Sequence, residues 1–205
     1  NLEIKTCQLV RLSRAGKPVK MSKRAGSFIT LKEIVNEVGK DAVRFMMVSR
    51  KNDAQLDFDF EVFKNENNDN PIFYIQYANA RISSLIRNSE EKIGIDIKDK
   101  DLLNANLALL QNENEKKIIF QIANFPKVIE QSATFMEPHR LSYYLRDLAS
   151  SFHQYWNLKI DNKRIHILDK SEIDLSLARV ALLFAVSITI KTGLGLLGIE
   201  AIEEL

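Results

Sequence analysis

The sequence predicts a mainly α-helical protein, in which a small α/β segment precedes a helical bundle. Only 7 Gly and 4 Pro occur among 205 residues, and this disfavours a turn-rich β-sandwich. Apolar residues recur at helical spacing over most of the chain after Pro71, which is the pattern of packed amphipathic helices. Hydrophobic residues make up 45% and charged residues 27%, as in soluble globular proteins. The longest apolar run is short for a bilayer, so we expect no membrane association.

Two extended segments are expected near the start of the chain. Residues 4–12 are rich in apolar and β-branched side chains and predict a strand. Gly16 before Pro18 predicts a turn, and a second extended segment should follow through Val19. Cys7 is expected to be a buried small hydrophobic side chain. As the single cysteine it excludes a disulfide framework and a cysteine-based zinc site, which suits a cytoplasmic location.

Two short helices should follow. Thr30 and Glu33 have the spacing of a capping box, so a helix is expected to begin at Leu31 and to end at Gly39. Asp41 can cap a second helix. The apolar positions of that second helix are Val43, Met46 and Met47.

The predicted domain boundary lies in the polar, acidic segment 51–70, which separates a unit of residues 1–65 from a unit of residues 66–205. The pair Asn70-Pro71 is a strong helix start, because Asn can cap and Pro is tolerated in the first turn. This helix should extend to about Ser89. Its core-facing positions are expected to be Ile72, Ile75, Ile82 and Ile86.

The rest of the chain predicts further helices. Pro126 and Pro138 are expected to interrupt them. The last helix is apolar nearly all round and should therefore be the buried centre of the bundle. The expected helical ranges are roughly 102–111, 113–124, 127–136, 139–159 and 173–196.

No metal site is expected. Asp57, Asp59 and Glu61 alternate with phenylalanines; such carboxylates could hold a metal, but solvent-facing positions on an amphipathic strand are the favoured interpretation. The three histidines lie far apart in the sequence and have no metal-ligand spacing. Of these, His153 falls on a predicted amphipathic helix, where a packed or surface histidine is the better interpretation.

Charge is distributed unevenly along the chain. Residues 1–51 contain 12 Lys/Arg and 4 Asp/Glu, whereas the remaining residues contain 17 and 23. A basic start on an acidic body favours an anionic partner, although solvated surface charge is about as good an explanation from composition alone. The densest positive charge is the segment Lys20–Gly26. Its lysines could approach a polyphosphate, but spacing alone leaves a basic surface loop equally plausible.

Several ordered blocks of residues resemble the arginyl-tRNA synthetase family. Lys20-Met21-Ser22-Lys23 matches the second signature of class I aminoacyl-tRNA synthetases. Blocks specific to the arginine enzymes accompany this signature over nearly the whole chain. They are Gln8–Leu12, Gly16–Gly26, Val38–Phe45, Leu56–Asp59, Asn70–Arg81, Phe152–Asn157, Leu177–Arg179 and Gly195–Ile199.

The resemblance implies that the chain is the C-terminal portion of such an enzyme, beginning inside its catalytic domain. It implies that Lys20 and Lys23 stabilise the phosphates of ATP during arginine activation, with Met21 and Ser22 in the same ATP-binding loop and Mg as the counter-ion of ATP. The partner signature His-x-Gly-His is absent from these residues. We therefore expect no aminoacylation by this portion alone and no tightly bound cofactor.

The resemblance also implies that residues 66–205 are the helical anticodon-binding domain, with arginine tRNA as partner and no role for DNA. At 3.6 residues per turn, Tyr74, Tyr77 and Arg81 share an arc of about 60°, and aromatic faces beside an arginine can stack unpaired bases. Tyrosines that extend the core are the alternative. Tyr155, Trp156 and Arg164 lie in or after a second matching block and complete the predicted tRNA contacts.

Two alternatives to this function stay open from the sequence. One is the tail of another class I synthetase, of the cysteine or methionine type. The other is a helical protein-interaction module without an RNA role. The acidic balance of residues 66–205 is an objection to RNA binding, since RNA-binding surfaces are usually basic. A local basic patch could answer it, formed by Arg81, Arg87, Lys159, Lys163 and Arg164.

Overall fold

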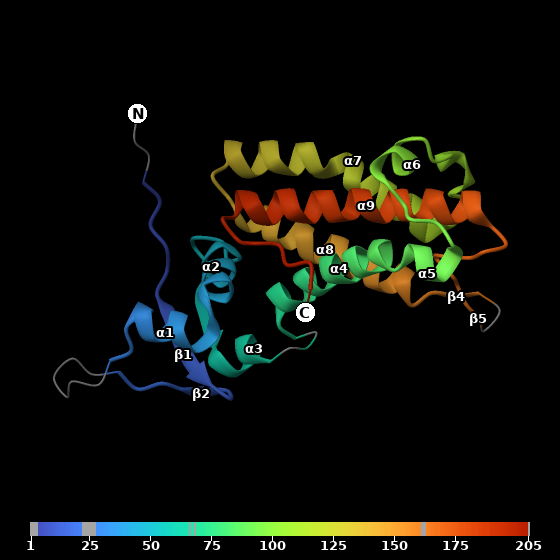
Figure 1. Ribbon diagram of the computed structural model, residues 1–205. Helices are drawn as coiled ribbons and strands as arrows, with labels where there is room; N and C mark the ends of the chain where they lie inside the picture. The colour runs from blue at the N-terminus through green and yellow to red at the C-terminus, as the bar shows by residue number, and fades with distance from the viewer. Residues whose placement is uncertain (1–3, 22–27, 66, 68, 161–162, 205) are drawn as a thin grey trace.

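A small sheet flanked by three helices forms the N-terminal part of the chain (Figure 1). The computed structural model describes residues 4–204 except 22–27, 66, 68 and 161–162. The sheet has the strand order β2-β1-β3, with β1 antiparallel to β2 and parallel to β3. These elements are β1 (Val10–Arg14), β2 (Lys17–Pro18), α1 (Leu31–Val38), α2 (Lys40–Val48), β3 (Leu56–Asp59) and α3 (Phe60–Lys64).

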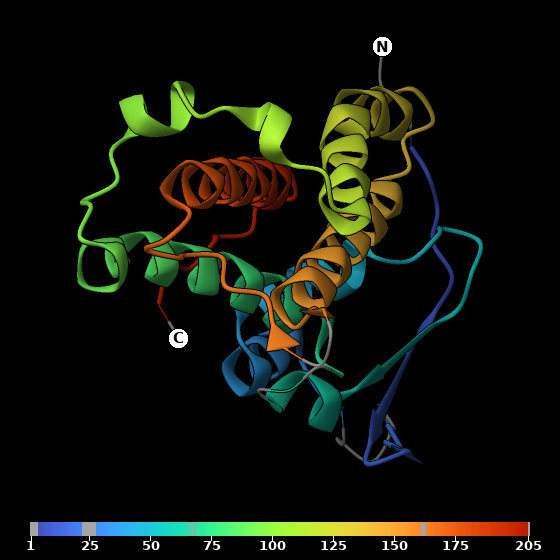
Figure 2. The same cartoon turned by 90° about the vertical axis from the view of Figure 1, so that its right-hand side faces the viewer.

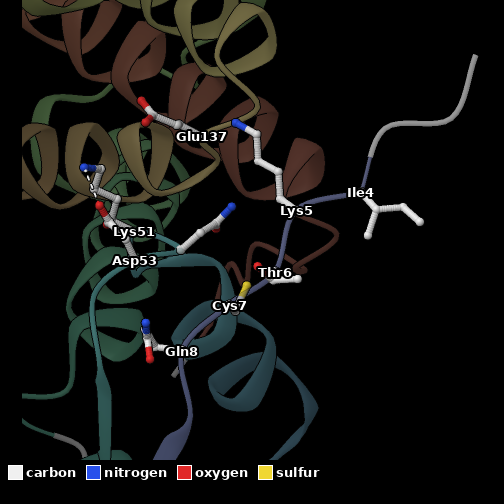
Figure 3. A pocket seen from close by; sticks show the side chains of 9 residues that line it. Ile4, Lys5, Thr6, Cys7, Gln8, Lys51, Asp53 and Glu137 are labelled. Carbon is white, nitrogen blue, oxygen red and sulfur yellow. Dashed lines mark hydrogen bonds and ion pairs between the residues drawn. The ribbon is translucent and has the colours of Figure 1, made fainter.

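A strand was predicted at residues 4–12, but the observed strand β1 begins only at Val10 and ends at Arg14. Pairing with β3 begins at the register Val10 with Leu56, so the described residues 4–9 lie outside the ladder. Cys7 in this segment is exposed, and the prediction of a buried cysteine is therefore wrong. Cys7 lines a pocket of about 470 Å³. Lys51 and Asp53 form an ion pair at this pocket, with 3.0 Å between Nζ and Oδ2 (Figure 3).

Helix α1 begins as predicted. Thr30 and Glu33 form a capping box, and Gly39 ends the helix at a φ of 88°. Gly39 is also the N-terminal cap of α2, so this one residue separates the two helices. Asp41 therefore lies inside the first turn of α2. The sequence analysis had assigned the N-terminal cap to Asp41, and that assignment is wrong. Met47, one of the three apolar positions expected on this helix, is 53% exposed, whereas Val43 and Met46 are buried.

Four long helices build the bundle in the C-terminal part, and they confirm a mainly helical fold with a small sheet. Figure 2 looks along α9, with α4 on one side of it, α7 and α8 on another, and the α6–η1 segment arching over it. The elements are α4 (Pro71–Arg87), α5 (Ser89–Ile93), α6 (Asp99–Leu103), η1 (Leu107–Leu109), α7 (Glu113–Thr134), α8 (His139–Trp156), β4 (Lys159–Ile160), β5 (Lys163–Arg164) and α9 (Ile173–Leu196).

Helix α9 is the core helix of the bundle, as its composition predicted. It contacts α4, α6, η1, α7 and α8, and Leu183, Val186 and Ile190 are fully buried. Its length and a mean hydropathy of 1.9 in its most apolar stretch would also suit a membrane span, but half of that stretch is buried inside the bundle. Ile188 and Leu196 remain on the exposed side, so the burial is strong without being complete.

Pro126 does not interrupt the helix that contains it. Helix α7 runs through this residue from Glu113 to Thr134, and the prediction of two helices is wrong. A proline inside a helix removes one backbone donor. Helix α7 packs against both α8 and α9, and the Tyr144 hydroxyl donates to the Gln121 carbonyl, five residues before the proline, at 2.9 Å. These contacts support a helix that continues through Pro126.

Helix α2 belongs to two hydrophobic cores. Its residues Ala42 and Phe45 are part of the bundle core. Val43 and Met46, on the neighbouring face, pack with the small sheet. The other members of the sheet core are Leu12, Ile34, Phe58 and Phe60. The two parts of the chain are therefore joined through a shared apolar helix as well as through the segment 65–70.

Candidate nucleic-acid interface and phosphate-binding residues

One face of α4 presents two aromatic rings and an arginine on successive turns. Residues Phe73, Tyr77 and Arg81 are spaced by four, which places their side chains above one another. The rings of Phe73 and Tyr77 are stacked with centroids 5.7 Å apart and an interplanar angle of 15°. The Arg81 guanidinium carbon lies 4.3 Å from the centroid of Tyr77. We call Phe73, Tyr77 and Arg81 the α4 ladder.

Helix α8 places Trp156 beside the α4 ladder. The guanidinium carbon of Arg81 is 5.4 Å from the centroid of the Trp156 ring, so one cation contacts two aromatic rings from two helices. Trp156 in turn packs on the fully buried Phe152, with centroids 5.5 Å apart. All four members, Phe73, Tyr77, Arg81 and Trp156, are half-buried. These planar side chains are therefore fixed by contacts with one another and with the core, and each remains partly accessible to solvent.

His153 supports the ladder from beneath. It is 7% exposed, its ring lies 4.4 Å from that of Tyr74 and 5.6 Å from that of Tyr77, and its Nε2 is 3.1 Å from the Tyr74 carbonyl. Burial lowers the pKa of His153, and the positive charge of Arg81 acts in the same direction against the raising effect of the Tyr74 carbonyl. A neutral imidazole is therefore favoured behind the two tyrosines.

Tyr74 lies at the boundary between the bundle core and the surface of α4. Its side chain is partly buried, packs against the bundle core and contacts His153. Tyr77 lies further out and is the tyrosine in contact with Arg81. The predicted arc on α4 is thus present, with Tyr74 at its inner edge.

The assignment of Tyr155 to RNA contact is wrong. Its side chain is fully buried, and its hydroxyl donates to Glu115 Oε1 at 2.8 Å. Arg179 Nε donates to the same oxygen at 3.2 Å, and its Nη1 donates to the His166 carbonyl at 2.9 Å. Burial, followed by the hydrogen bond to Glu115, raises the pKa of Tyr155. This tyrosine joins α7, α8 and α9 and offers no open face to a base.

The predicted basic patch is only partly assembled. Lys159 is exposed at the start of β4, and the backbone of Lys163 and Arg164 forms β5; the side chains of these last two residues lie outside the described part of the chain. Arg87 turns to the C-terminal segment instead, donating to the Glu203 carbonyl at 3.3 Å and pairing with Glu204 at 3.3 Å. Among the patch residues whose side chains the structure describes, Arg81 is the one placed against the Tyr77 and Trp156 rings.

Lys20 follows the second strand of the small sheet. The backbone N–H of Val19 donates to the Leu12 carbonyl at 2.9 Å, so the chain is tied to β1 up to the residue before Lys20. Lys20 and Met21 are exposed. Ser22 and Lys23, the rest of the predicted ATP-binding loop, lie outside the described residues. Within the described part of the chain, no group of three His, Cys, Asp or Glu side chains could hold a metal ion.

Comparison with known proteins identifies the bundle. Residues 75–205 match the model of the DALR anticodon binding domain. The chain belongs to this family. The DALR match contains the α8 and α9 helices and all of α4 from Ile75 onward, and therefore includes Tyr77, Arg81 and Trp156.

Relatives of this DALR-domain chain confirm the resemblance to arginyl-tRNA synthetases. The chain is 50% identical to the arginine–tRNA ligase of Parvibaculum lavamentivorans, over 99% of this chain and 35% of that protein. It is 46% identical to the arginine–tRNA ligase of a Methylobacterium species, over 100% of this chain and 35% of that protein. The chain thus spans about a third of the length of the curated relatives that it matches.

A solved structure shows the same fold. A protein from Campylobacter jejuni assigned as an arginyl-tRNA synthetase superposes with a TM-score of 0.80 at 30% sequence identity, covering 97% of this chain and 40% of that one. The cysteine- and methionine-type alternatives are not favoured by any of these comparisons. The structure brings together Tyr77, Arg81 and Trp156, which the sequence had named, with Phe73 and His153, which it had not named as site residues. The four-residue spacing of Phe73 to Tyr77 was the available signal for the first of these.

Proposed function

We propose that this chain supplies two functions to an arginine–tRNA ligase. Residues 66–205 bind the anticodon stem-loop of arginine tRNA, and Lys20 with Lys23 binds the phosphates of ATP, whose counter-ion is Mg²⁺. The complete ligase joins arginine to its tRNA at the expense of ATP. The relatives carry the name of this activity, and the chain matches about a third of their length.

The observation that carries the RNA-binding proposal is the position of Arg81 between the Tyr77 and Trp156 rings. Proteins read single-stranded RNA by stacking splayed bases on aromatic rings and guanidinium planes, with about 1–3 kcal/mol for each stacked base. The α4 ladder and Trp156 provide such planes from two packed helices. Because Phe152 and His153 hold them from behind, little side-chain entropy would be lost on binding.

The acidic balance of residues 66–205 does not oppose this proposal strongly. Two acidic residues near the C-terminus are engaged by cations, since Lys191 pairs with Glu203 at 2.6 Å and Arg87 with Glu204 at 3.3 Å. Stacking also depends less on net charge than phosphate contact does. Binding by this surface should accordingly show a modest dependence on salt.

The test is binding of an arginine tRNA anticodon hairpin to the 205-residue chain and to its Tyr77→Ala variant. We expect about a tenfold loss of affinity or more for Tyr77→Ala, in line with one lost stacking contact. Tyr143→Ala is the matched control, because Tyr143 on α8 also lies under an arginine, with 5.8 Å between Arg146 Cζ and the ring centroid. Equal affinity for an unrelated hairpin, or an equal loss in both variants, would contradict the proposal.

The phosphate proposal is supported by the charge and position of Lys20. A lysine ammonium is a compact point charge that suits a polyphosphate whose negative charge grows as a phosphoryl bond breaks. Lys20 is exposed two residues after a strand that is paired in the sheet, and Val19 between them is hydrogen-bonded to β1. In the complete ligase, Lys20→Ala should slow arginine-dependent exchange between ATP and pyrophosphate, and an unchanged exchange rate would refute the assignment.

A further inference from the structure

The hairpin that leads into Lys20 contains a strained turn. Ala15 has a φ of 47° and Gly16 a φ of 74°, and they join Arg14 of β1 to its partner Lys17 of β2. Two successive residues with positive φ are typical of the type I′ turn that links two-residue hairpins. Glycine adopts this conformation freely, but alanine does so at a cost of about 1 kcal/mol. Surrounding contacts must therefore hold Ala15 in place.

The Asp59 carboxylate provides those contacts. Its Oδ1 accepts from the Ala15 N–H at 3.1 Å and from the Glu61 N–H at 3.0 Å. Its Oδ2 accepts from the Gly16 N–H at 2.6 Å and from the Ser13 hydroxyl at 3.2 Å. The turn thus makes a small anion-binding nest of backbone amides, and the protein fills the nest with its own carboxylate. The hydrogen bonds, led by that from Gly16, lower the pKa of Asp59.

Asp59 connects this hairpin to the rest of the N-terminal part. It is the last residue of β3, pairs in register with Ser13 of β1, and caps α3 through the Glu61 N–H. One carboxylate therefore joins the β1–β2 turn, β3 and the start of α3. Its neighbour Phe60 is fully buried, so this corner of the fold is anchored in the small core.

The far side of segment 19–30 is fastened to the same corner. Helix α1 follows that segment, and its Glu37 accepts from Arg14 Nη2 at 2.6 Å and pairs with Lys64 of α3 at 2.6 Å. Arg14 lies over the Phe60 ring with 4.4 Å to the centroid. The hydrogen bonds from Arg14 and then Lys64 lower the pKa of Glu37 to about 2. Both flanks of the segment therefore depend on the β3–α3 corner.

We infer that Asp59 is a positioning residue for arginine activation. By holding the Ser13–Gly16 turn, it fixes the direction in which β2 delivers Lys20 to the phosphates of ATP. Asp59 itself does not touch the nucleotide. The inference rests on the proposed phosphate role of Lys20. It gives a role to a carboxylate that the sequence pattern alone assigns to the solvent-facing side of a strand.

The chemistry of the site predicts what an amide would do there. In Asp59→Asn only one side-chain oxygen can accept, while the other position becomes an N–H donor facing backbone donors. The variant keeps either the Gly16 bond or the Ala15 and Glu61 bonds, and the turn relaxes. Because misplacing a group by about 1 Å can cost about 100-fold in rate, the expected loss is in kcat.

The experiment compares four variants of the complete ligase by ATP–pyrophosphate exchange. Asp59→Asn should lower kcat about 10- to 100-fold while the KM for ATP changes less than about threefold. Asp57→Asn is the matched control, because it removes the same charge from an exposed position on the same strand; its kcat should stay within about twofold of the unmodified enzyme. Lys20→Ala provides the reference loss.

The fourth variant tests the turn itself. Ala15→Gly combined with Asp59→Asn should recover at least part of the lost kcat, since glycine adopts the turn without the carboxylate. Anticodon-hairpin binding should be normal in all four, which shows that each variant is folded. A normal kcat in Asp59→Asn beside a slow Lys20→Ala overturns the inference alone. A normal Lys20→Ala overturns the phosphate role as well, and a loss in Asp59→Asn that Ala15→Gly does not relieve overturns the turn as its route.

Discussion

The Arg44 Nε on α2 donates a hydrogen bond to the Leu197 carbonyl at the end of α9. This contact ties the helix that follows the basic segment to the core helix of the bundle. It places a cation at the negative end of the α9 dipole. Gly198 follows at a φ of 69°, and a Cβ built on it would lie 2.5 Å from Arg44 Nε.

Gly198→Ala should therefore destabilise the protein. Alanine must adopt an unfavourable positive φ at this position, and its methyl group must displace the Arg44 side chain. We expect the free energy of unfolding to fall by about 1–3 kcal/mol, measured by urea denaturation of the chain. Gly16→Ala, at a φ of 74° with open space around the new Cβ, isolates the backbone cost. An equal loss in both variants would show that the Arg44 contact contributes nothing.

Two tyrosine hydroxyls in the bundle, one fully and one partly buried, should differ in their contribution to stability. Tyr155 donates to the carboxylate of Glu115 at 2.8 Å, whereas Tyr144 donates to the neutral carbonyl of Gln121 at 2.9 Å. Hydrogen bonds to a charged group contribute about 1.5–3 kcal/mol, and neutral ones about 0.5–1.5 kcal/mol. Tyr155→Phe should lower the free energy of unfolding more than Tyr144→Phe does. The reverse order would contradict the role assigned to Glu115.

His153 should make stability depend on pH in mildly acidic solution. Its folded-state pKa is lowered from 6.5 by burial, so the unfolded chain binds the proton more readily. Stability should therefore rise with pH between the folded pKa and about 6.5, and fall as pH is lowered through that window. His153→Gln should flatten the profile of unfolding free energy in this range. His139, whose pKa is also lowered by burial, keeps its own contribution in the variant, and an unchanged slope would contradict a neutral His153.

Lys23→Ala in the complete ligase should lower kcat for arginine activation more than it weakens ATP binding. This follows if the ammonium stabilises charge that develops only in the transition state. The measurement is ATP–pyrophosphate exchange with ATP and arginine varied separately. Lys32→Ala, at an exposed position in the first turn of α1, is a control for loss of positive charge. A rise in KM for ATP without loss of kcat would indicate ground-state binding only.

Local signals in the sequence predicted the helix boundaries that they control. The capping box at Thr30 and the Asn70-Pro71 start are both present, because each is satisfied by atoms within one turn. Pro126 misled the analysis because α7 is held across it by packing on α8 and α9. Such contacts come from residues far away in the sequence, and no local pattern reports them.

In the candidate site, too, local patterns were predicted correctly and long-range contacts were not. Helical spacing on one element predicted that Arg81 and Tyr77 lie side by side, as they do. Tyr155 was misassigned, although it lies seven residues after Leu148 and three after Phe152, two positions of the core face that are fully buried. Its hydroxyl donates to Glu115, forty residues away in the sequence. This hydrogen bond offsets the cost of burying the polar hydroxyl. The meeting of Trp156 with Arg81 needed the crossing of α4 and α8, which only the structure gives.

Helix α2 contributes residues to two hydrophobic cores, with Phe45 in the bundle core and Met46 in the sheet core. A shortened protein starting at residue 66 would lack Phe45, and the apolar bundle residues that pack against it would be exposed to water. We expect such a piece to aggregate, whereas one that retains residues 31–65 should stay dispersed. The folding unit that carries the proposed RNA-binding surface would then be larger than residues 66–205.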